Sequence, residues 1–150
     1  MRIASLVCAA LVVTACTKSD EAEMERKFVV KEITALEKAL ADGSESGVTV
    51  ECAALRASLP RLDATTVARI ERLCDGEGAK LFLRKAIADV NARNAQYPNT
   101  REINCMQLFA KTAFESFGRR PEPELEKLVT EYATLCPGEA AKIRNPPPIH

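Results

Sequence analysis

The sequence predicts an all-α protein, a small helical bundle of about six helices built from two disulfide-stapled helical hairpins. Three observations support this fold class. Apolar residues recur at helical spacing, every three or four positions, along most of the chain after residue 24. No stretch alternates between apolar and polar residues as a half-buried strand does. Four cysteines fall on the apolar stripes, where they can join neighbouring helices.

The first predicted helix starts at about Asp20 and ends at the glycine- and serine-rich residues 43–47. Met24, Phe28 and Val30 lie beside or off its main stripe, so its apolar surface is wider than one neighbouring helix covers. Such a helix is more often buried on two sides and less often carries a docking face. The main stripe consists of Val29, Ile33, Leu36 and Leu40.

The second and third helices form the first predicted hairpin, with its turn at residues 60–63. Pro60 ends the second helix, and Asp63 is a typical N-cap residue for the third. Residues 75–78, which contain two glycines, are expected to end the third helix. The stripes of this hairpin consist of Val48, Cys52, Leu55, Leu59, Val67, Ile70, Leu73 and Cys74.

The fourth helix is expected to end before residues 97–99, and a capping-box pattern at residues 99–102 precedes the fifth. Residues 118–123 form the turn to the sixth helix, which Pro137 and Gly138 close. A short helix around residues 139–144 is a further expectation. The stripes of these helices consist of Leu83, Ile87, Val90, Met106, Phe109, Ala113, Phe117, Leu125, Val129, Tyr132 and Cys136.

Two segments resemble each other and suggest that a hairpin was duplicated, since residues 73–81 read LCDGEGAKL and residues 135–143 read LCPGEAAKI. A disulfide across a hairpin needs cysteines about equally far from the turn. The midpoint of Cys52 and Cys74 falls at the first turn, and that of Cys105 and Cys136 falls in the second. Pairing Cys52 with Cys74 and Cys105 with Cys136 is therefore the favoured connectivity among three. Redox activity is the disfavoured alternative, because no pair has Cys-x-x-Cys spacing.

The N-terminus indicates export. Residues 3–13 form an apolar core that suits a signal peptide and is shorter than the roughly 20 residues that span a bilayer. Residues 11–16, LVVTAC, resemble the lipobox of bacterial lipoproteins, and the resemblance covers about the first 17 residues. It implies cleavage before Cys16 and acyl chains such as palmitate on that cysteine. In bacterial lipoproteins, an aspartate directly after the acylated cysteine commonly retains the protein at the inner membrane. Thr17 occupies that position here, so the resemblance implies an outer-membrane anchor with the domain facing the periplasm.

Ordinary cleavage after Ala15 is the alternative. It would leave Cys16 as an unpaired thiol beside the four cysteines that are expected to pair, whereas the lipobox interpretation places lipid on Cys16. The predicted organisation is a signal peptide at residues 1–15 and a lipidated spacer at 16–23. A disulfide-stapled helical domain occupies 24–144, and a Pro-rich, non-helical tail occupies 145–150.

Composition argues against several functions. Basic and acidic side chains balance at 21 each, which gives no support for nucleic-acid binding. His150 is the only histidine, and no Gly-rich phosphate loop occurs. We therefore expect no catalytic residues, no metal and no cofactor. Six hairpin arginines are interpreted as a solvated face, with partner contacts at the hairpin tips as the alternative. These arginines are Arg56, Arg61, Arg69, Arg72, Arg119 and Arg120.

The resulting hypothesis is a membrane-anchored, non-catalytic protein-interaction or scaffolding module of the cell envelope. Its expected partners are the membrane, through lipid on Cys16, and an envelope protein. One alternative is a small-ligand or lipid-binding helical module; another is an inhibitor of an envelope enzyme. A cavity of several hundred cubic ångströms would favour ligand binding, and a filled interior would argue against it. The ligand hypothesis rests on four apolar side chains of the fifth helix, Met106, Phe109, Phe114 and Phe117.

Overall fold

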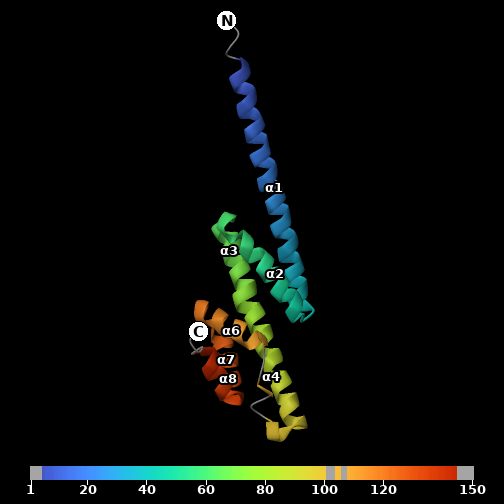
Figure 1. Ribbon diagram of the computed structural model, residues 1–150, viewed down its shortest axis with the longest axis vertical. Helices are drawn as coiled ribbons and strands as arrows, with labels where there is room; N and C mark the ends of the chain where they lie inside the picture. Colours follow the sequence, from blue (N-terminus) through green and yellow to red (C-terminus); the bar gives the residue numbers. More distant parts are fainter. Residues whose placement is uncertain (1–4, 101–103, 106–107, 145–150) are drawn as a thin grey trace, which may run out of the picture.

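The computed structural model describes residues 5–100, 104–105 and 108–144, with side chains for 20–100, 104–105 and 110–144. All regular secondary structure in these ranges is helical, which confirms the all-α prediction. Figure 1 shows a long first helix whose N-terminal half stands clear of the other helices. The remaining helices form the body of the molecule around a long central helical run.

Helix α1 (Ser5–Ala41) and helix α2 (Glu45–Ser58) form the first antiparallel pair. Gly43 turns the chain between them with a φ of 65°, a conformation that favours glycine. Ser44 then caps α2, because its Oγ accepts a hydrogen bond from the Gly47 amide at 3.2 Å. Helix α1 begins well before Asp20, so it includes the backbone of the predicted signal peptide and spacer from Ser5 onward.

The turn of the first hairpin lies where it was predicted. A single 3₁₀ turn, η1 (Leu59–Arg61), follows α2, and helix α3 (Ala64–Glu71) begins behind Asp63. The Asp63 carboxylate accepts hydrogen bonds from the Thr66 amide at 3.0 Å and the Thr66 hydroxyl at 2.7 Å. The N-cap prediction for Asp63 is therefore confirmed.

The prediction that residues 75–78 end the third helix is wrong. A π-helical segment, η2 (Arg72–Gly78), follows α3 directly and leads into helix α4 (Ala79–Gln96) without a break. Gly78 has helical dihedral angles, and a Cβ there would lie 3.0 Å from Cγ1 of Val48. The glycine thus serves close packing between helices rather than chain reversal.

Helix α4 is followed by a short 3₁₀ turn, η3 (Pro98–Thr100), and then by helices α6 (Leu108–Arg119), α7 (Pro123–Leu135) and α8 (Pro137–Arg144). The expected short C-terminal helix is present and starts at Pro137. Part of the predicted capping box, the side chains of Met106 and Phe109, and the Pro-rich tail at residues 145–150 lie outside the described residues and side chains.

Six helices make up the described residues when α3, η2 and α4 are counted as one continuous helix and the short 3₁₀ turns are left out. The count matches the prediction, but its composition differs. The predicted third and fourth helices are joined, and α8 is added at the C-terminal end.

Both disulfides have the predicted connectivity. Cys52 and Cys74 are joined across the first hairpin with a Cα–Cα distance of 5.7 Å, and Cys105 and Cys136 across the second at 5.5 Å. All four cysteines are buried in one apolar core that runs through both hairpins. The hairpins meet mainly through η2 and α4, because α6 and α7 pack on α4 and α6 also contacts η2. The largest fully buried core side chains include Leu36, Leu55, Ile70, Leu83, Leu125 and Tyr132.

Candidate functional site

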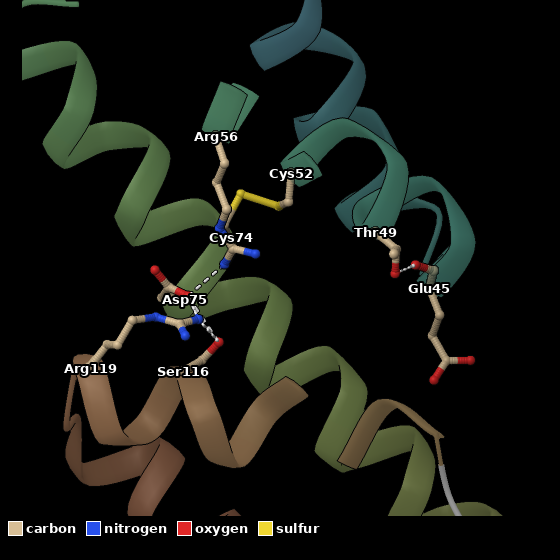
Figure 2. The surroundings of a disulfide bond; sticks show 8 residues. All are labelled: Glu45, Thr49, Cys52, Arg56, Cys74, Asp75, Ser116 and Arg119. Carbon is tan, nitrogen blue, oxygen red and sulfur yellow. Dashed lines mark hydrogen bonds and ion pairs between the residues drawn. A yellow bond between two sulfur atoms is a disulfide. The ribbon is translucent and has the colours of Figure 1, made fainter. Parts of the chain in front are cut away.

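The centre of the molecule holds a buried carboxylate between the two hairpins. Asp75 lies in η2, one residue after the disulfide-bonded Cys74, and its side chain is 10% exposed. Its Oδ1 accepts hydrogen bonds from Arg56 Nη2 at 2.7 Å, Arg119 Nη2 at 2.6 Å and Ser116 Oγ at 2.9 Å. Figure 2 shows the two arginines reaching this oxygen from different helices, α2 and α6. One carboxylate therefore ties three helical segments together.

Local sequence explains how the helices present these groups. Arg56 lies one helical turn beyond Cys52, so the disulfide fixes the α2 turn that carries it next to η2. Ser116 and Arg119 lie three residues apart on one face of α6, and Arg119 also donates to the Ser116 hydroxyl at 3.2 Å. The π-helical turn places Asp75 between them, and such turns are often found at functional sites.

The electrostatics favour an ionised Asp75. Burial alone would raise its pKa, but hydrogen bonds from Arg119 and Ser116 and the charges of Arg56 and Arg119 outweigh burial. The pKa of Asp75 is therefore lowered below its ordinary value of 3.8. A carboxylate with a lowered pKa is a weak general base, so its contact with the Ser116 hydroxyl does not activate a nucleophile.

A cleft of 370 Å³ opens beside this cluster. Arg56 and Leu59 form one wall and Thr112, Glu115 and Arg119 the opposite one, while residues of α3 and η2 form the floor. The floor residues are Ile70, Glu71, Cys74 and Asp75. The cleft is thus charged at its sides and partly apolar at its base.

A second charged cluster joins η2 and α4 to the start of α7. The buried Lys80 donates to Glu77 at 2.7 Å, and its Nζ lies 3.5 Å from Glu122 and 3.7 Å from Glu124. Burial alone would lower the pKa of Lys80, but the carboxylates outweigh it and raise that pKa. Arg84 also pairs with Glu124. This cluster therefore adds a second charged contact between the hairpins, through residues that are not part of the Asp75 cluster.

A second hollow of 860 Å³ lies where α1 extends beyond the body, and we call it the α1 groove. Met24 is 63% exposed and Phe28 is 43% exposed, so neither is covered by a second helix. Arg61 of the first turn lies at the groove, 3.3 Å from Glu25. The commoner expectation for these side chains, burial on two sides of α1, is wrong for the described chain. The full lining is Glu21, Ala22, Met24, Glu25, Phe28, Ser58 and Arg61.

The aromatic residues behind the ligand hypothesis lie elsewhere. Phe114 is buried and packs edge-to-face against Tyr132, with ring centroids 5.9 Å apart. Phe114 and Phe117 also line a pocket of 320 Å³ near α8, which Arg144 partly covers from 5.7 Å above the Phe114 ring. Phe114 therefore belongs mainly to the core, with a shallow pocket at its edge.

The six arginines all remain partly exposed, and five of them pair with carboxylates. Arg56 and Arg119 lie at Asp75, which sequence reasoning missed because it assigned residues 75–78 to a helix end. Arg61, Arg69 and Arg120 pair with Glu25, Glu37 and Glu122 respectively, and Arg72 is exposed. The sequence contained one signal that could have pointed to Asp75. The two duplicated segments differ at this position, because the second copy has Pro137 where the first has Asp75.

Cys16 lies within helix α1, but its side chain is outside the part of the chain whose side chains are described. Among the described residues, no helix combines the length and apolar character needed to cross a membrane. In the same part of the chain, no three His, Cys, Asp or Glu side chains are placed to hold a metal ion. Comparison with known proteins gives no match, whether with protein families, curated proteins or solved structures.

Proposed function

We propose that this chain is a lipid-anchored interaction module of the bacterial cell envelope, held at the periplasmic face of the outer membrane through Cys16 and without catalytic activity of its own. The observation that carries the proposal is the α1 groove. Met24 and Phe28 stay exposed there, whereas Val29, Ile33 and Leu36 of the main stripe of α1 are buried. Large apolar side chains that gather at an exposed hollow are typical of protein interaction sites.

The position of the groove relative to the anchor supports a partner close to the membrane. An α-helix rises 1.5 Å per residue, so Phe28 would lie about 18 Å along α1 from Cys16. A lipidated Cys16 would therefore hold Met24 and Phe28 near the lipid headgroups. Acylation with several chains would make such an anchor lasting, because a single chain binds a membrane only marginally.

The anchor is tested by intact mass and membrane fractionation of the full-length protein produced in a bacterium. We expect a chain that begins at Cys16, carries acyl mass and gains four protons on reduction of its two disulfides. Cys16→Ser should abolish the acyl mass and release the protein from membranes. Cys8→Ser, within the predicted signal peptide, is the matched control and should change neither. An unacylated chain that fractionates as soluble would contradict the anchor.

The interaction is tested by placing a photo-crosslinking amino acid at position 28 and irradiating intact cells. We expect one dominant adduct, which mass spectrometry identifies and which weakens when Met24 is replaced by Ser. The same crosslinker at Lys127, an exposed residue of α7, is the control. Equal background adducts from both positions would contradict an interaction through the α1 groove. If the crosslinked partner were an envelope enzyme, measuring the activity of that enzyme with and without this protein would test the inhibitor alternative.

A small-ligand function is the second candidate, and the cleft beside Asp75 is the observation that favours it. Its volume of 370 Å³ is within the usual range for small-molecule sites, about 300–1,000 Å³. The charged walls of the cleft do not suit a lipid tail, so a ligand there would need a polar group.

A further inference from the structure

We propose that the cleft between the hairpins binds a small apolar monocarboxylic acid, with Arg56 and Arg119 holding the carboxylate and Asp75 acting as a positioning residue. This site lies apart from the α1 groove and does not depend on the proposed interaction function. Its elements are a pair of guanidinium groups, a buried carboxylate that orients them and a lining that is partly apolar.

The two arginines have donors to spare. Each one directs a single nitrogen, Nη2, at Asp75, whereas a guanidinium carries five N–H donors. Their side chains are 38% and 51% exposed and line the cleft, so the remaining donors are open to a ligand. Asp75 supplies one negative charge against the two of the arginines, although Glu71 and Glu115 also line the cleft. A ligand carboxylate that reaches the two guanidinium groups would accept charge-assisted hydrogen bonds from their remaining donors.

Asp75 prepares the site before any ligand arrives. Its side chain is nine-tenths buried, and Ser116 donates to the same oxygen that both arginines contact. A flexible arginine normally loses conformational freedom when it binds an anion, which weakens the affinity. Because Asp75 already restrains both guanidinium groups, most of that loss has occurred in the folded protein.

The rest of the cleft defines the body of the ligand. The apolar part of the lining consists of the half-buried Leu59 and the buried Ile70 and Cys74. Glu71 and Glu115 also line the cleft, and their negative charge disfavours a second anionic group on the ligand. The ligand class is therefore a compact acid with one carboxylate and an apolar remainder, such as an aromatic acid.

The probe is benzoate, titrated into the full-length protein in a neutral detergent and followed by ligand-observed saturation-transfer NMR with a detergent blank. We expect saturable binding of benzoate. Benzamide has the same shape without the charge, and we expect no saturable binding. Terephthalate carries a second carboxylate and should bind more weakly than benzoate.

Substitutions locate the site. Arg56→Gln and Arg119→Gln should each weaken benzoate binding about tenfold, because each removes a charge-assisted contact. Glu71→Gln should strengthen it about two- to threefold by removing negative charge from the cleft. Arg69→Gln is the matched control, since Arg69 lies on α3 close to the cleft but is not part of its lining and pairs with Glu37. It should leave binding unchanged.

Circular dichroism of each variant separates lost binding from lost structure. A gain of affinity in Glu71→Gln cannot arise from unfolding, so the proposal remains testable even if the arginine variants are unstable. Absence of saturable benzoate binding, equal binding of benzoate and benzamide, or an equal loss of binding in Arg69→Gln would each overturn the proposal.

Discussion

The contacts of Asp75 join residues that are distant in the sequence. Arg56 lies 19 positions before it and Arg119 lies 44 positions after it. Helical spacing shows which residues share a face of one helix, but it does not show which faces of different helices meet. The stripe residues were therefore predictable, whereas the pairing of Arg56 and Arg119 with one carboxylate was not. Only the fold determines that two of the six arginines share one buried carboxylate.

Asp75→Asn tests this contact through its effect on stability. The pKa of Asp75 is lowered in the folded protein, so its ionised form contributes stability above pH about 4 and that contribution is lost as pH falls through the folded-state value. At neutral pH we expect a loss of about 2 kcal/mol in the free energy of unfolding, because two half-exposed arginines lose their shared carboxylate. Urea denaturation followed by circular dichroism measures this difference, which should shrink below pH about 4.

Asp42→Asn provides the control for that measurement. Asp42 forms an exposed ion pair with Lys38, so we expect a change below about 0.5 kcal/mol. A difference between wild type and Asp75→Asn that stayed constant from neutral to acidic pH would contradict the role assigned to this carboxylate.

The two copies of the duplicated segment adopt different structures, and one residue accounts for the difference. In the second copy, Pro137 lacks an amide hydrogen and disfavours helical dihedral angles at Cys136, which has φ −132° and ψ 61°. Helix α7 therefore ends at Leu135 and α8 starts afresh. In the first copy, Asp75 replaces the proline, and the helix continues through a π-helical turn. Sequence likeness predicted two hairpin ends, and only the second was right.

The packing of the π-helical segment is tested by Gly78→Ala, with Gly118→Ala as the matched control. A Cβ at Gly78 would meet Val48 Cγ1 at 3.0 Å and the Leu73 carbonyl oxygen at 3.4 Å, so we expect a loss of about 1–2 kcal/mol in stability. A Cβ at Gly118 of α6 would enter open space, and alanine should stabilise that helix by about 0.5–1 kcal/mol. Thermal and chemical denaturation measure both. Stabilisation by both alanines would show that Gly78 is not needed for close packing.

At the scale of the whole molecule, the cysteine positions were the most informative part of the sequence. Each pair is centred on a turn, and this symmetry fixed the disulfides and hence the two hairpins. The relation between the hairpins was not predictable in the same way. It depends on the unbroken run of α3, η2 and α4, and on charged contacts such as those of Asp75 and Lys80 that form only after the helices pack.

The order of the disulfides along the chain has a consequence for biogenesis. Each disulfide joins two consecutive cysteines of the domain, so the two covalent loops neither overlap nor enclose one another. In a chain that emerges N-terminus first into an oxidising compartment, Cys52 and Cys74 can pair before Cys136 has crossed the membrane. Oxidation in order of arrival thus yields the native bonds directly, and maturation requires an oxidant but no reshuffling of mispaired thiols.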